Sequence, residues 1–132
     1  MPARDPLAVL ARLRRVETDQ ARRRLGERIA RSAAAEARVQ AAQDAFAREG
    51  AVADQPSDYG AWLVRGLAER ARATLSLDLE RRAEEEARQA LADARGAGRA
   101  VERLAADRAR SDARDAGRTA QARIDDIIAA RR

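Results

Sequence analysis

One short segment, Gly50–Asp58, interrupts a chain that otherwise has the composition of long helices. It holds Pro56 together with glycine, serine and aspartate residues, which is typical of a turn. About a quarter of the residues are alanine and about a fifth are arginine, and both residue types favour helix. A single break between two such stretches predicts an all-α fold, an antiparallel two-helix coiled-coil hairpin whose second helix is longer than the first.

The expected boundaries follow from capping residues. Asp5 can cap the first helix, with Pro6 in its first turn, and Gly50 is a suitable stop. Ser57 or Asp58 can cap the second helix. We therefore predict one domain over residues 1–132, with helix one at about 5–49, a turn at about 50–57 and helix two at about 58–130.

Steps of three and four residues predict which side of helix one faces helix two. The expected contact row from the middle of helix one onward is Leu25, Ile29, Ser32, Glu36, Val39, Gln43 and Phe46. Upstream, after one irregular step, it consists of Leu7, Leu10, Arg14, Glu17 and Ala21. Helix two carries large apolar residues at Trp62, Leu63, Leu67, Leu75, Leu77, Leu79, Leu91, Val101 and Leu104.

The two helices cannot match in length. At 1.5 Å per residue they extend for roughly 65 Å and roughly 105 Å, so residues up to about 104 can pair with helix one. The remainder projects as a single helix or bends at Gly96–Gly98 or Gly117. It ends in Ile124, Ile127 and Ile128, which either await a partner or make ordinary local contacts.

Several functional classes are disfavoured by what the sequence lacks. It contains no cysteine and no histidine, no glycine-rich phosphate loop and no closed cleft for paired carboxylates. We expect no enzyme, no catalytic residue, no metal and no cofactor. Because no apolar run approaches the roughly 20 residues that span a bilayer, we expect a cytoplasmic protein without direct membrane insertion.

The net charge of +5 invites a nucleic-acid interpretation, since all 27 basic residues are arginine. Lysine and asparagine are absent, however, which is typical of a GC-rich genome. Acids also precede bases by four residues, the order that supports a solvated helix face. The pairs are Asp19 with Arg23, Glu27 with Arg31, Asp44 with Arg48 and Glu84 with Arg88. We expect no nucleic-acid partner, although the segment 12–31 could face another anionic partner.

Nearly the whole chain resembles the FliJ family of flagellar export proteins, which is related to the YscO-type proteins of injectisomes. In helix one the resemblance rests on the run from Leu7 to Leu13, on Asp19 and Ala21, and on Leu25-Gly26-Glu27. In helix two it rests on Tyr59, Trp62, Leu63 and Leu67, and on the tail Glu102-Arg103-Leu104, Arg108, Gln121 and 124–131.

The resemblance implies a non-enzymatic stalk of the type III protein export apparatus. Such a stalk is a coiled coil that inserts into the hexameric flagellar export ATPase, promotes assembly of its ring and contacts the membrane export gate protein. Export chaperones are a further partner class, and the location would be cytoplasmic, at the membrane face of the flagellar base. Whether the system is flagellar or an injectisome stays open.

By this likeness the tip of the hairpin faces the gate and the joined termini face the ring. The candidate gate contacts are Tyr59, Trp62, Arg38 and Ala42. In this part of helix one the family commonly has aromatic or large apolar residues, so Arg38 and Ala42 depart from its pattern. The candidate ring contacts are Arg14, Arg15, Arg22, Arg23, Ile124, Ile127 and Ile128.

Three alternatives stay open. Tyr59 and Trp62 could simply pack across the turn onto Phe46 or Leu63. The protein could be a generic coiled-coil adaptor or chaperone-like binder, which would dimerise through the end at Ile124–Ile128 and affect no ATPase. An arginine-rich nucleic-acid binder would show affinity that falls steeply with salt.

Overall fold

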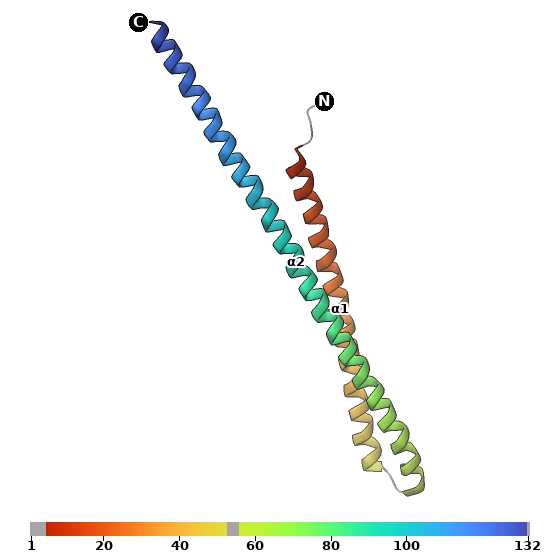
Figure 1. The fold of residues 1–132 in the computed structure, drawn as a ribbon. Coiled ribbons are helices and arrows are strands. Elements are labelled where there is room, and N and C mark those ends of the chain that lie inside the picture. Colours follow the sequence, from red (N-terminus) through yellow and green to blue (C-terminus); the bar gives the residue numbers. More distant parts are fainter. Residues whose placement is uncertain (1–4, 53–55, 132) are drawn as a thin grey trace. The chain divides into compact units, whose positions relative to one another are not determined.

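The computed structural model describes residues 5–52 and 56–131 and contains two helices. Helix α1 spans Pro6–Val52 and helix α2 spans Pro56–Ala130 (Figure 1). The predicted all-α hairpin, with the second helix longer, is confirmed. In the part of the chain that the structure describes, no helix is both long enough and apolar enough to cross a membrane.

The beginning of α1 is capped as the sequence predicts. The carboxylate of Asp5 accepts a hydrogen bond from the backbone N–H of Leu7 at 3.1 Å, and its backbone carbonyl accepts one from Val9 at 3.1 Å. Pro6 follows as the first helical residue, where its missing N–H costs no hydrogen bond. Asp5 therefore satisfies one of the free donors at the helix start.

The helix ends near the turn differ from the prediction. Gly50 does not stop α1, which continues to Val52, and no glycine among the described residues has the positive φ of a C-terminal glycine cap. Helix α2 begins at Pro56, before the expected caps Ser57 and Asp58, because proline is pre-organised for a first helical position. The rest of the predicted turn, residues 53–55, lies outside the described residues.

The chain divides into two compact units, each built from part of both helices. The first comprises Met1–Thr18 and Asp93–Arg132, and the second Asp19–Ala92. Within the second unit α1 and α2 lie side by side, and the buried residues are Ser32, Ala35, Ala73, Leu77 and Leu91. Most of these side chains are small, so the two backbones approach closely and the core is narrow.

In the second unit the contact row of α1 differs from the predicted one at alternate positions. Leu25, Ser32, Val39 and Phe46 face α2 as predicted, since they are buried or half-buried. Between them lie Arg28, Ala35 and Ala42, and the predicted Ile29, Glu36 and Gln43 are exposed. Ala35 is only 1% exposed, because a close helix pair accommodates alanine better than the neighbouring charged Glu36. Ile29 is 46% exposed, and its predicted place is taken by the half-buried Arg28, which contacts Glu80 of α2.

The first unit has the contact row that the sequence predicts. Leu7, Leu10, Arg14, Glu17 and Ala21 are all half-buried, although Ala21 itself belongs to the second unit. On α2, Val101 is buried and Ala105 is the last residue that is not fully exposed. The predicted limit of pairing near residue 104 is thus confirmed, and α2 continues as one helix through Gly96–Gly98 and Gly117.

Candidate functional site

An aromatic cluster joins the last turns of α1 to the first turns of α2. The rings of Phe46 and Trp62 meet edge to face, with centroids 5.0 Å apart and an interplanar angle of 73°. Tyr59 stacks on Trp62 at 5.9 Å, and the guanidinium of Arg70 lies 5.3 Å from the centroid of Phe46. These four residues, here called the tip cluster, connect the two helices through π contacts and one cation–π contact.

A shallow groove lies beside the tip cluster. Its volume is about 350 Å³, and it is lined by Ala42, Ala45, Phe46, Trp62, Arg65, Gly66 and Glu69. Gly66 keeps part of it open, since a Cβ atom there would lie 3.2 Å from Cζ of Phe46 and 3.5 Å from Cζ2 of Trp62. The groove therefore offers an apolar floor and a charged rim to a side chain from outside.

The candidate gate residues do not all behave alike. Trp62 packs across the turn onto Phe46, and Tyr59 packs on Trp62, so both are half-buried rather than free anchors. Ala42 lines the groove, whereas Arg38 is exposed and does not line it. The predicted alternative, packing across the turn onto Phe46 or Leu63, thus holds for Trp62, whereas Tyr59 contacts Trp62 of its own helix. A contact of these residues with the gate stays a prediction.

Ion pairs between the helices fix their alignment in the second unit. Arg81 contacts Glu36 at 2.5 Å, and Arg28 contacts Glu80 at 3.7 Å. Arg28 and Glu80 are half-buried, and one carboxylate oxygen of Glu80 is buried without a hydrogen bond. A charged pair at such a position favours one alignment of the helices over shifted ones, at some cost in stability.

Further ion pairs lie within single helices. The predicted pair of Glu84 and Arg88 forms at 2.7 Å, and Glu85 contacts the same guanidinium at 2.8 Å. Hydrogen bonds with Glu85 and then Glu84 raise the pKa of Arg88 above its ordinary value. Asp19 contacts Arg22 at 3.5 Å. These acidic neighbours neutralise part of the arginine charge on the surface.

The candidate ring arginines fall into two groups. Arg14 is half-buried in the first unit and bonds to Glu17 at 2.8 Å, with its Nε atom buried and unbonded. Arg15, Arg22 and Arg23 are exposed. Because Arg14 lies in the contact row of the first unit, it is a packing residue. The other three arginines are accessible to a partner, although Arg22 shares its charge with Asp19.

The last part of α2 has no cover from α1. Every described residue of 106–131, here called the C-terminal arm, is exposed. Ile124, Ile127 and Ile128 are 50%, 55% and 52% exposed, so the candidate ring contacts at this end are free to meet a partner. Three exposed isoleucines within five residues form an apolar surface of the kind that marks an interaction site.

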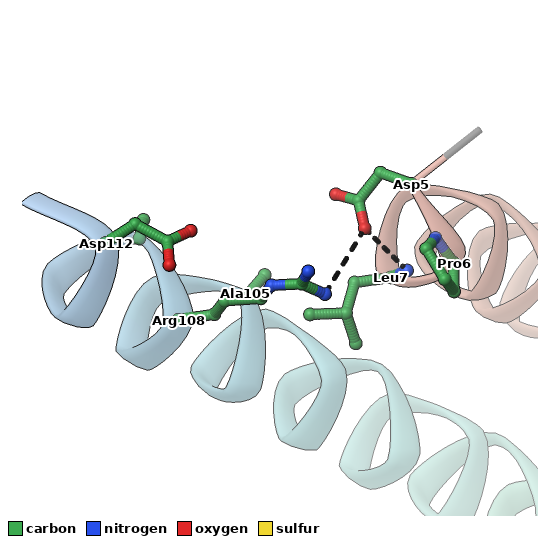
Figure 2. A pocket seen from close by; sticks show the side chains of 7 residues that line it. Asp5, Pro6, Leu7, Ala105, Arg108 and Asp112 are labelled. Atoms are coloured by element: carbon green, nitrogen blue, oxygen red, sulfur yellow. Dashed lines mark hydrogen bonds and ion pairs between the residues drawn. The ribbon is translucent and has the colours of Figure 1, made fainter. Parts of the chain in front are cut away.

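The start of α1 meets the base of the C-terminal arm at a notch that sequence reasoning missed. Figure 2 shows the guanidinium of Arg108 directed toward Asp5, with Nη1 and Oδ1 3.8 Å apart. The notch has a volume of about 380 Å³ and is lined by Asp5, Pro6, Leu7, Ala105, Arg108, Ala109 and Asp112. Its only signal in the sequence was the capping role of Asp5.

The acidic residues that the structure describes do not gather at one place. Within residues 5–52 and 56–131 there is no group of acidic side chains that could hold a metal ion. The groove beside the tip cluster and the C-terminal arm both include apolar side chains that solvent reaches. No family model, no curated protein and no solved structure matches this chain.

Proposed function

We propose that the protein is a non-enzymatic stalk of a bacterial flagellar type III protein export apparatus. In this role it inserts into the export ATPase ring, promotes assembly of the ring and couples it to the membrane export gate. One observation carries the proposal: α2 of the hairpin continues past the start of α1. This last part of α2 is not covered by α1, and it has exposed isoleucines near its end. The order of residues shared with the FliJ family supports it independently.

The C-terminal arm is the part proposed to enter the ring. A helix about 10–12 Å wide with its side chains can occupy a narrow central space that a globular domain cannot. Ile124, Ile127 and Ile128 supply the apolar contact, and the exposed Arg15, Arg22 and Arg23 of α1 supply positive charge. A ligand that contacts several ATPase subunits at once binds only the assembled ring and therefore shifts the equilibrium toward it.

The groove beside the tip cluster is the part proposed to contact the gate. It can accept one apolar side chain between Ala42 and Gly66, with Arg65 and Glu69 at its rim. Because Phe46 and Trp62 already pack on each other, the groove is formed before a partner binds. In this proposal the protein acts in the cytoplasm, at the membrane face of the flagellar base.

The arginines give less support to a nucleic-acid function. Many of them are already paired with carboxylates, as in Arg14, Arg22, Arg28, Arg72, Arg81, Arg88, Arg108, Arg110 and Arg118. Binding to phosphate would have to displace these acids, which weakens the electrostatic gain.

The test of the stalk proposal measures the ATPase activity and hexamer population of the host's export ATPase, with and without this protein. We expect stimulation together with more hexamer. Ile127→Asp should abolish both effects, while Leu79→Asp makes the same change at a leucine of similar exposure on the second unit and should preserve them. No stimulation and no co-migration with the ATPase would refute the proposal.

The two ends are tested separately with Trp62→Ala. This variant should keep the stimulation of the ATPase and lose binding to the cytoplasmic part of the gate protein, because the tip cluster shapes the groove. Loss of ATPase stimulation by Trp62→Ala in a folded protein would contradict the assignment of separate partners to the two ends.

A further inference from the structure

The C-terminal arm carries a continuous apolar row that begins beside the first residues of α1. Its members follow one another in steps of four, four and three residues: Ala105, Ala109, Ala113, Ala116, Ala120, Ile124 and Ile127. These steps repeat every 11 residues, a period that places all members of the row on one side of a nearly straight helix. The contact row of α1 in the second unit has a seven-residue period instead. No charged residue occupies the row between Ala105 and Ile127.

The row continues the face that α2 already uses for pairing. Val101 and Ala105 face α1, which runs antiparallel to α2 and begins at Pro6 over the notch. Figure 2 shows Leu7 beside α2 near Ala105. Every described residue of α2 beyond Ala105 is exposed. A helix that ran in the direction of α1 and ended at the notch would extend the same antiparallel interface along the arm.

The charges that flank the row indicate what that helix is. Asp112 and Arg123 are 11 residues apart and therefore border the row on the same edge. When two copies of the arm lie antiparallel and centred near Gly117, the same edges face each other. Asp112 of each copy then comes level with Arg123 of the other.

We propose that two copies of this chain associate through their C-terminal arms in an antiparallel pair. Each arm then packs on the apolar row of the other copy's arm, which α1 does not cover. The last helical residues of each arm reach the notch of the other copy, beside its Leu7. This self-association is independent of the proposed function, because it concerns the protein alone.

Side-chain size supports the antiparallel direction. In this arrangement Ile124 and Ile127 of one copy lie level with the segment around Ala109 of the other, so large residues meet small ones at both ends of the contact, and alanines meet each other at its centre. A parallel pair in register would instead place alanine on alanine over most of the row and isoleucine on isoleucine at its end. The antiparallel pair also sets the carbonyl end of one arm against the amino end of α1 in the other copy, which the helix dipoles favour.

The pairing has a consequence for the proposed stalk. Ile124 and Ile127 are candidate ring contacts, and they would be covered in the pair. The same face of the C-terminal arm would bind the second copy in the free protein and the ATPase in the ring complex. The ATPase and the second copy would therefore compete for it.

The first test is a charge exchange measured by sedimentation equilibrium on the full chain. We expect wild-type protein to show a reversible monomer–dimer equilibrium. Asp112→Arg and Arg123→Asp should each raise the dimer Kd by about 2- to 30-fold, since two pairs per dimer become repulsive. The double variant D112R/R123D should restore the Kd. All variants should keep the wild-type helix content, because Asp112 and Arg123 are both exposed.

A matched exchange distinguishes the two directions. In a parallel pair Asp112 would face Arg110, so D112R/R110D would restore association and D112R/R123D would not. That result would overturn the antiparallel proposal. A wild-type protein that stays monomeric at hundreds of micromolar would overturn self-association altogether, while leaving the ATPase test of the stalk proposal unaffected.

Crosslinking provides an independent check, since the chain has no cysteine of its own. A single cysteine at Ala116, near the centre of the pair, should form a disulfide between copies. Cysteines at Ala109 and Ile127 should crosslink when the two variants are mixed, and much less within either variant alone. Crosslinking of Ile127→Cys with itself, at the efficiency of Ala116→Cys, would contradict the antiparallel arrangement.

Discussion

Three leucines spaced two residues apart on α2 test which face of α2 packs on α1 in the second unit. Leu77 is 6% exposed, whereas Leu75 and Leu79 are 61% and 56% exposed. Truncation of Leu77 to alanine removes a side chain that is almost completely shielded from water. Burial of a leucine is worth about 1.5–3 kcal/mol, and leucine-to-alanine changes in protein cores cost about 2–5 kcal/mol.

We expect Leu77→Ala to cost about 2–3 kcal/mol, at the lower end of that range. The core of a two-helix pair is narrow and open at its sides, so water and neighbouring side chains can reach part of the space that the leucine leaves. Leu75→Ala and Leu79→Ala should change the free energy of unfolding by less than about 0.5 kcal/mol, because alanine and leucine have similar helix propensities and little burial is lost.

The measurement is urea unfolding at fixed protein concentration, followed by circular dichroism at 222 nm, with the wild-type chain and all three variants compared under the same conditions. A fixed concentration keeps any self-association equal between samples. Equal destabilisation by Leu77→Ala and Leu79→Ala would refute the assignment of Leu77 to the seam. It would mean that α2 packs on α1 through a different face.

Three further changes test other contacts. Asp5→Ala should destabilise the protein by about 1 kcal/mol through loss of the helix cap, and Asp5→Asn by less because the amide can still cap; equal losses in thermal unfolding would show that the charge, not the cap, is what matters. Gly26→Ala should stabilise by up to about 1 kcal/mol, and Gly66→Ala by clearly less because its Cβ crowds a phenylalanine ring; an equal gain would mean that the ring moves aside freely. A double-mutant cycle on Glu36 and Arg81 should yield a coupling of about 0.2–1 kcal/mol that shrinks in 1 M salt, and a salt-independent value would contradict an exposed ion pair.

The fold could be predicted because composition and one break determine it almost alone. Pro56 and its neighbours mark the only strong interruption, and Asp5 with Pro6 marks the helix start. The exact ends near the turn could not be predicted. Proline suits both a turn and a first helical position, and glycine stops a helix only where the backbone adopts a positive φ.

The contact row of α1 in the second unit could be predicted only at alternate positions. Leu25 and Phe46 fix the seven-residue period, but the intermediate position can follow after three residues or after four. The prediction placed Ile29 and Glu36 at these positions, whereas the structure has Arg28 and Ala35 there. At Ala35 the small side chain suits the close approach of the helices, and at Arg28 an ion pair with Glu80 accompanies the contact.

Of the candidate site residues, the isoleucines were the more predictable. A helix longer than its partner must leave its end uncovered, so the exposure of Ile124 and Ile127 follows from helix lengths alone. The packing of Trp62 on Phe46 depends on how the two helices approach each other at the turn, and the sequence allowed either outcome. Contacts with other proteins depend on surfaces that this sequence does not contain.

The uncovered arm also has a consequence for helix–coil equilibrium. Its helical hydrogen bonds are supported only by the helix itself, but it grows from the paired part of α2 and so avoids the cost of nucleation. Fraying should proceed from Ala130 inward, with Gly117 as the weakest point, since glycine costs about 1 kcal/mol relative to alanine in a helix. Amide hydrogens should therefore exchange fastest beyond Gly117 and progressively more slowly toward Val101. Any partner that binds the isoleucines must complete the ordering of that last segment, and its affinity should fall as temperature melts the free arm.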